Sequence, residues 1–126
     1  FMSNKTNCSQ CHSGFNFTNY TFENNGLYTN YADSGRMRLT QLESDRARFK
    51  VPTLRNAQLT APYMHDGSIK TLEEVVAHYN TGGKIHANKS TFIKPLGLTQ
   101  EEQNDIVAFL KTLSDYTFIN NKNLQK

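Results

Sequence analysis

The chain has 126 residues, which is the length of one domain. Apolar residues make up 37% of it, below the roughly 45–50% of typical soluble domains, and Trp is absent. The net charge of +3 is too weak for a nucleic-acid interface, and no run of about 18 apolar residues predicts a membrane span. No secretion signal is recognisable either. Because the aliphatic core is thin for this length, we expect another group to complete it.

The two cysteines lie close together, in Cys8-Ser9-Gln10-Cys11, and His12 follows directly. A disulfide across two residues would constrain the unfolded chain very little. A thioredoxin-like pair expects a preceding strand, and a zinc site expects more closely spaced ligands than this sequence offers. Cys-x-x-Cys-His is instead the spacing for covalent attachment of c-type haem, in which two thiols bind the porphyrin edge and the His ligates the iron. The motif therefore predicts haem c bound by Cys8, Cys11 and His12.

The haem motif and the residues before it predict where the protein works and whether the chain is part of a longer one. Covalent haem attachment takes place outside the cytoplasm, so we expect a periplasmic or otherwise exported protein. Small c-type cytochromes place a helix before the attachment motif, but only seven residues precede Cys8. We interpret Phe1 and Met2 as the end of that helix and the chain as a fragment of a larger protein.

The middle of the chain predicts little regular structure. Residues 13–35 are rich in Asn, Tyr, Thr and Gly, a composition typical of a loop. A short helix is expected around residues 39–47. Pro52 favours an extended, fixed loop after it.

Two helices are predicted in the second half. The first begins with the capping box Thr71/Glu74 and ends near residue 80, and the second begins with Thr99/Glu102 and ends near residue 114. Their apolar faces consist of Leu72, Val75, Val76 and Tyr79 in the first helix and Ile106, Phe109, Leu110 and Leu113 in the second. Residues 116–126 are expected to form a C-terminal tail on the surface.

A six-coordinate haem requires a second axial ligand. The candidates are Met37, Met64, His65, His78, Tyr79 and His86. Tyr79 lies on the apolar face of its helix, whereas His78 is rotated about 100° away from that face. On this pattern alone, Tyr79 is equally well an ordinary buried tyrosine or a ligand, and Met64, in a loop, is the alternative ligand.

Four motifs occur together in a fixed order. They are Cys8-Ser9-Gln10-Cys11-His12, Phe49-Lys50-Val51-Pro52-Thr53-Leu54-Arg55-Asn56, Leu59-Thr60-Ala61-Pro62-Tyr63-Met64-His65-Asp66-Gly67 and Thr71-Leu72-Glu73-Glu74-Val75-Val76. Over about residues 1 to 115, this set resembles the C-terminal haem domain of the bacterial di-haem cytochrome c peroxidase family, which includes the MauG-type enzymes. The resemblance implies an all-α, cytochrome-c-like domain at 1–115 wrapped around one covalent haem with long loops, followed by a tail at 116–126.

The resemblance also implies a function. An N-terminal haem domain, absent from this chain, would reduce hydrogen peroxide to water or act as in MauG-type oxidases. This chain would relay electrons to it from a small cytochrome or cupredoxin, so that we expect part of an oxidoreductase without a catalytic acid or base of its own. A homodimer or larger assembly is compatible with this expectation.

The resemblance assigns further site residues. The peroxidases carry a Met ligand fourteen residues after the His that corresponds to His65, and MauG-type members carry a Tyr there, as this chain does at Tyr79. His65 is expected to form hydrogen bonds near the haem. Arg55 is expected to bind a haem propionate, with anchoring of a loop as the alternative. The carbonyl oxygens of Thr60 and Pro62 are expected to contribute to a calcium site shared with the absent domain.

Two other functions compete with the relay domain. One is a free-standing mono-haem cytochrome that carries electrons, which predicts Met64 as the ligand and a sulfur-to-iron absorption band. The other is an accessory haem subunit of a larger assembly. A second Cys-x-x-Cys-His upstream of Phe1 would favour the relay domain over both.

Overall fold

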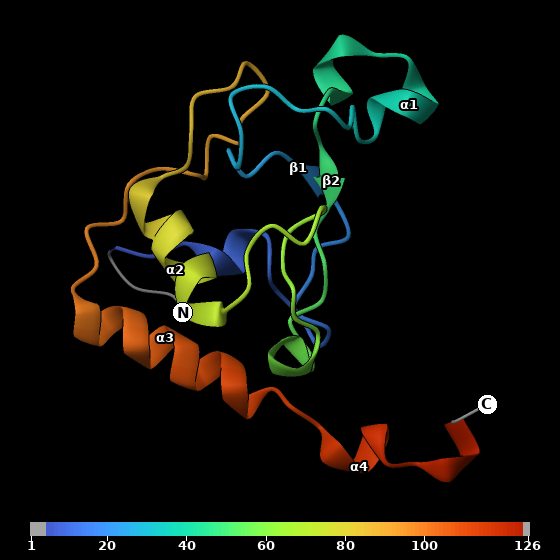
Figure 1. Ribbon diagram of the computed structural model, residues 1–126, viewed down its shortest axis with the longest axis vertical. Helices are drawn as coiled ribbons and strands as arrows, with labels where there is room; N and C mark the ends of the chain where they lie inside the picture. The colour runs from blue at the N-terminus through green and yellow to red at the C-terminus, as the bar shows by residue number, and fades with distance from the viewer. Residues whose placement is uncertain (1–4, 125–126) are drawn as a thin grey trace.

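Helical segments and long loops make up most of the structure, a computed structural model that describes residues 5–124 (Figure 1). The expected helix end at Phe1 and Met2 lies outside the described residues. The elements in chain order are the 3₁₀ turn η1 (Cys8–Gln10), β1 (Phe22–Glu23), α1 (Met37–Thr40), η2 (Glu43–Asp45), β2 (Phe49–Lys50), η3 (Ala57–Leu59), α2 (Leu72–Thr81), α3 (Gln100–Thr112), α4 (Tyr116–Ile119) and η4 (Lys122–Leu124).

Both predicted long helices are confirmed as α2 and α3, and each begins with its predicted capping box. In α2, the Thr71 hydroxyl accepts from the Glu74 N–H at 3.2 Å, and the Glu74 carboxylate accepts from the Thr71 N–H at 3.0 Å. These pairs satisfy N–H groups that have no partner inside the helix. Gly82 ends α2 at a φ of 79°, where a side chain would collide with Pro95. The local sequence therefore determines where both helices start and where α2 stops.

The core lies between α2 and α3. Leu72 and Val76 of α2 are buried against Val107 and Leu110 of α3. The apolar face predicted for α3 does not include Val107, because the prediction followed a single row of apolar positions along the helix. The structure buries a broader face, on which Ile106 and its neighbours are only partly covered.

The expectation of a strictly all-α fold is wrong for the described residues, because β1 and β2 form a small antiparallel sheet (Figure 1). Phe22 pairs with Lys50 and Glu23 with Phe49. Strands of two residues have no hydrophobic alternation that a sequence pattern could detect. The sheet joins the loop 13–35 to the segment before Pro52, so it holds two distant parts of the chain side by side.

The expected helix around residues 39–47 forms as two separate turns, α1 and η2. Gln41 interrupts the helix with a left-handed φ of 62°, and Leu42 is extended. An ion pair between Arg36 and Asp45, 3.2 Å long, connects the segments on either side.

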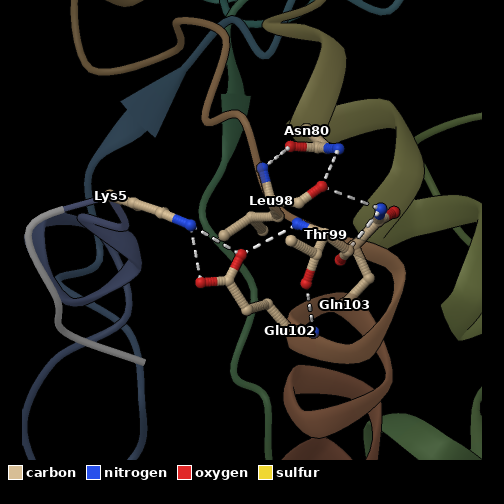
Figure 2. Close-up of polar contacts among 6 residues, drawn as sticks. All are labelled: Lys5, Asn80, Leu98, Thr99, Glu102 and Gln103. Atoms are coloured by element: carbon tan, nitrogen blue, oxygen red, sulfur yellow. Dashed lines mark hydrogen bonds and ion pairs between the residues drawn. The ribbon is translucent and has the colours of Figure 1, made fainter.

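Side-chain contacts join the N-terminal segment, α2 and α3 (Figure 2). Lys5 Nζ lies 2.7 Å from a carboxylate oxygen of Glu102, the residue that caps α3. The side chain of Asn80, in α2, both donates to the carbonyl of Leu98 and accepts from its N–H at 2.8 Å. These contacts fix the loop that enters α3 relative to the other two segments.

The C-terminal residues leave the body of the molecule (Figure 1). Asp115 caps the short α4, and the apolar side chains of Tyr116 and Phe118 are exposed. Within residues 5–124, no helix has the length and apolar character to cross a membrane.

Candidate haem site

A large cavity lies between the N-terminal segment, the sheet, α2 and α3. Its empty volume, including the open mouth, is about 1150 Å³. It is lined by Asn7, Cys8, Cys11, His12, Glu23, Asn25, Phe49, Lys50, Val51, Pro52, Leu54, His65, Val75, Val76, Tyr79, Phe92, Ile93, Lys94, Leu96, Leu98, Ile106 and Leu110. Sites for cofactors typically have mainly apolar walls and a few polar groups. The lining of this cavity has that character.

The attachment motif forms a single turn at one wall of the cavity. The amide N–H groups of Cys11 and His12 both donate to the carbonyl of Cys8, at 3.2 and 2.9 Å. This turn brings both thiols and the imidazole to the same cavity. Burial raises the pKa of both Cys8 and Cys11. Reactive redox cysteines have a lowered pKa, so the environment disagrees with a thioredoxin-like pair.

His12 is held in one orientation. Its Nδ1–H donates to the carbonyl oxygen of Phe17 at 3.0 Å. A carbonyl can only accept, so Nδ1 carries the proton and Nε2 keeps its lone pair. Burial lowers the pKa of His12, which favours the neutral ring. A neutral imidazole with its second nitrogen fixed by a hydrogen bond is the usual state of a metal-binding histidine.

Tyr79 of α2 lines the cavity, and His78 beside it does not. Burial raises the pKa of Tyr79, and a hydrogen bond with the side chain of Asn25 partly opposes this. His78 donates from Nε2 to the Asn25 carbonyl at 3.0 Å. Tyr79 therefore faces the cavity and His78 does not, as the helical periodicity of the sequence predicts.

The two neighbouring ligand candidates Met64 and His65 occupy different places. Met64 is absent from the cavity wall, and its sulfur accepts a hydrogen bond from Asn25 Nδ2 at 3.1 Å. His65 does line the cavity, with its ring stacked on Phe49 at a centroid distance of 3.9 Å. Of these two, only His65 therefore borders the space that a cofactor would fill.

The three remaining predicted site residues lie outside the cavity wall. Arg55 Nε donates to the carbonyl of Phe15 at 2.9 Å, and its guanidinium lies 4.0 Å from the centre of the Phe15 ring. These contacts are those of the loop anchor that the sequence left as the alternative. Thr60 and Pro62 lie in an exposed loop after η3, and the Thr60 hydroxyl contacts the carbonyl of Ala57.

Sequence reasoning missed several polar residues in the wall. Lys50 and Lys94 bring positive charge to the cavity, and Asn25 and Glu23 bring an amide and a carboxylate. Lys50 belongs to a quoted motif, so its position there was a usable signal. Asn25 and Lys94 lie in loops without a pattern, and only the tertiary structure identifies them.

The residues present fit a covalently bound haem. Two thiols, one imidazole lone pair and a phenol face the same largely apolar cavity. Over residues 5–124, no group of three or more His, Cys, Asp or Glu side chains is arranged to hold a metal ion by itself.

Known proteins with similar sequences and structures agree with this reading. The family model for cytochrome c matches residues 2–114. Cytochrome-c peroxidase IdrP1 of Denitromonas iodatirespirans is 46% identical over 65% of this chain and 22% of its own length. MauG of Methylorubrum extorquens is 38% identical over 86% of this chain and 31% of its own length. A solved structure described as a MauG-like protein associated with microbial copper homeostasis has a TM-score of 0.85 and 35% identity, over 91% of this chain and 44% of that one.

The chain spans between a fifth and a third of the length of these two relatives. The attachment turn and the family match establish haem c as the covalent cofactor. The chain belongs to the cytochrome c family, and within it corresponds to the C-terminal haem domain of the di-haem cytochrome c peroxidases and MauG.

Proposed function

We propose that this chain is the electron-relay haem domain of a di-haem peroxidase or MauG-type oxidase. The observation that carries this proposal is that Cys8, Cys11, His12 and Tyr79 line one cavity. The peroxidases and MauG proteins among its relatives support the enzyme class. Reduction of hydrogen peroxide, or oxidation by a MauG-type reaction, would take place at a second haem outside this chain.

The residues of the chain have distinct roles in this proposal. Haem c, when bound, supplies one-electron transfer through ferric and ferrous iron. Cys8 and Cys11 hold it covalently, and the Phe17 carbonyl keeps the Nε2 lone pair of His12 available as the proximal ligand. The apolar walls of α2 and α3 exclude water from the ligand atoms.

Tyr79 is the proposed sixth ligand. A phenolate is anionic and favours the ferric state, so it lowers the reduction potential relative to a Met ligand. Its place in the cavity wall supports this role, whereas Met64 lies outside that wall.

Replacement of Tyr79 by Phe tests the ligand directly. The Tyr79→Phe protein should change its ferric absorption and EPR spectra and shift to a higher reduction potential, because the anionic ligand is lost. A Tyr116→Phe variant, altered at an exposed tyrosine on the C-terminal tail, should leave both unchanged. An unchanged spectrum in Tyr79→Phe would show that Tyr79 is an ordinary buried side chain and not a ligand.

The number of haems per polypeptide tests the relay function. The relay domain requires two haems and a second Cys-x-x-Cys-His in the native protein. One haem per native polypeptide would favour the mono-haem electron carrier, which also predicts a Met64 sulfur-to-iron band.

The proposal has further parts that follow from the resemblance. They are export to the periplasm, an N-terminal haem domain as partner, and electron donation by a small cytochrome or cupredoxin. Calcium at the carbonyls of Thr60 and Pro62 belongs to the same set. For the haem propionates, Lys50 and Lys94 are better placed than Arg55, because they line the cavity.

A further inference from the structure

A series of aromatic side chains leads from the cavity wall toward the molecular surface. Phe49 and His65 both line the cavity and stack on each other at a centroid distance of 3.9 Å. Tyr31 lies beside both rings, with its centre 5.7 Å from that of His65 and 6.1 Å from that of Phe49. Tyr28 follows, 5.5 Å from Tyr31 and 6.3 Å from His65. Separations of this size are typical of rings in contact, so a continuous path of rings connects the cavity with the half-buried Tyr28.

The hydroxyl of Tyr28 has a partner that can take its proton. It donates to a carboxylate oxygen of Asp66 at 2.7 Å. Tyr31 instead donates to a side-chain amide oxygen at 3.2 Å, and Tyr63 donates to a backbone carbonyl oxygen at 3.0 Å. An amide or carbonyl oxygen accepts a hydrogen bond but is too weak a base to accept the proton itself, whereas a carboxylate at this distance can do so. Of these three tyrosines, only Tyr28 therefore has a proton acceptor.

A positive charge lies over the ring of Tyr28. The Nζ atom of Lys84 is 5.4 Å from the ring centre. Loss of an electron alone would leave a positively charged ring beside this ammonium group, which is electrostatically unfavourable. A ring that loses its proton together with the electron stays neutral. The contacts of Tyr28 with Lys84 and with Asp66 thus both favour the joint loss of an electron and a proton.

We propose that Tyr28 is a redox-active tyrosine, which supplies an electron to the haem through the rings of Tyr31 and His65 when no external donor is bound. This inference rests on the proposed function, because the oxidant is hydrogen peroxide. Tyr28 replaces one of the two electrons that peroxide withdraws from the haems as it is reduced to water. The phenol O–H bond breaks, a new O–H bond forms on the Asp66 carboxylate, and Tyr28 remains as a neutral phenoxyl radical.

The test uses the native protein with its haems bound, mixed with hydrogen peroxide without an electron donor and frozen for EPR spectroscopy. The wild type should show a tyrosyl radical. Tyr28→Phe keeps the ring but should lose this signal, and its peroxide-oxidised haem spectrum should decay more slowly. Asp66→Asn keeps an oxygen that accepts the hydrogen bond but cannot take the proton, so the signal should fall. Tyr116→Phe, altered at an exposed tyrosine of the tail, should match the wild type.

Tyr31→Phe distinguishes the two neighbouring tyrosines. It keeps the ring that connects the path and removes the hydroxyl, so the radical should still form on Tyr28. A radical that persists in Tyr28→Phe, disappears in Tyr31→Phe or keeps its full intensity in Asp66→Asn would overturn the inference. If peroxide oxidises the haems of the wild type without any tyrosyl radical, the inference alone fails. If peroxide leaves the haem spectrum of the wild type unchanged, the proposed function fails and the inference fails with it.

Discussion

At the scale of single residues, hydrogen bonds determine the state of several ionisable groups beside the cavity. Asp66 follows the cavity-lining His65 and is exposed. Desolvation acts to raise its pKa, but hydrogen bonds from the Tyr28 hydroxyl, at 2.7 Å, and from the Ser68 N–H, at 3.1 Å, lower the pKa to about 2. Tyr28 thereby ties the loop after β1 to the loop before α2.

Replacement of Tyr28 by Phe should raise the pKa of Asp66 toward its ordinary value of 3.8. Because the folded-state pKa is the lower one, the stabilising contribution is complete above about pH 4 and is lost as pH falls toward 2. Tyr28→Phe should therefore lower the free energy of unfolding at pH 7 by at most about 1 kcal/mol, since the exposed carboxylate is screened by solvent. Carboxyl titration by NMR and denaturation at pH 7 and pH 2 measure this. An equal loss at both pH values would contradict it.

At the scale of elements, the capped helices α2 and α3 form the rigid wall of the site. Packing of their apolar faces against each other stabilises both helices, and the capping boxes add to this at the helix starts. The cap of α3 has an added role, because Glu102 also binds Lys5 of the segment that leads into the attachment turn.

Thr99→Ala should destabilise the protein by about 1 kcal/mol, because an amide N–H at the start of α3 loses its partner. Thr112→Ala makes the same change at an exposed hydroxyl near the end of α3 and should cost less than about 0.5 kcal/mol. Thr99→Ser keeps the cap oxygen and should restore most of the stability. Chemical denaturation measures all three, and equal losses in Thr99→Ala and Thr112→Ala would contradict the role of the cap.

At the scale of the whole molecule, the cavity takes the place of a larger aliphatic core. The buried cluster between α2 and α3 contains Leu72, Val76, Val107 and Leu110, and residues from distant parts of the chain line the space beside it. A bound porphyrin would cover those apolar walls, and the transfer of their surface from water would stabilise the fold. This accounts for the low apolar content of the sequence.

Replacement of both Cys8 and Cys11 by Ala should abolish covalent haem, detectable as a loss of haem mass by intact mass spectrometry. The apolar walls would then be exposed to water, so the thermal midpoint should fall and unfolding should become less cooperative. Ser9→Ala, between the two cysteines, keeps both thiols and should retain haem and stability. A double variant with wild-type stability would show that the fold does not depend on the cofactor.

The sequence alone determined the attachment turn, both capping boxes and the cytochrome c family. These depend on residues within a few positions of one another, where spacing and local hydrogen bonds decide the structure. It could not determine the β1–β2 pair, the breadth of the buried face at Val107 or the position of Asn25. These depend on contacts between residues far apart in the chain. Only the tertiary structure decided that Tyr79 lines the cavity and that Met64 does not.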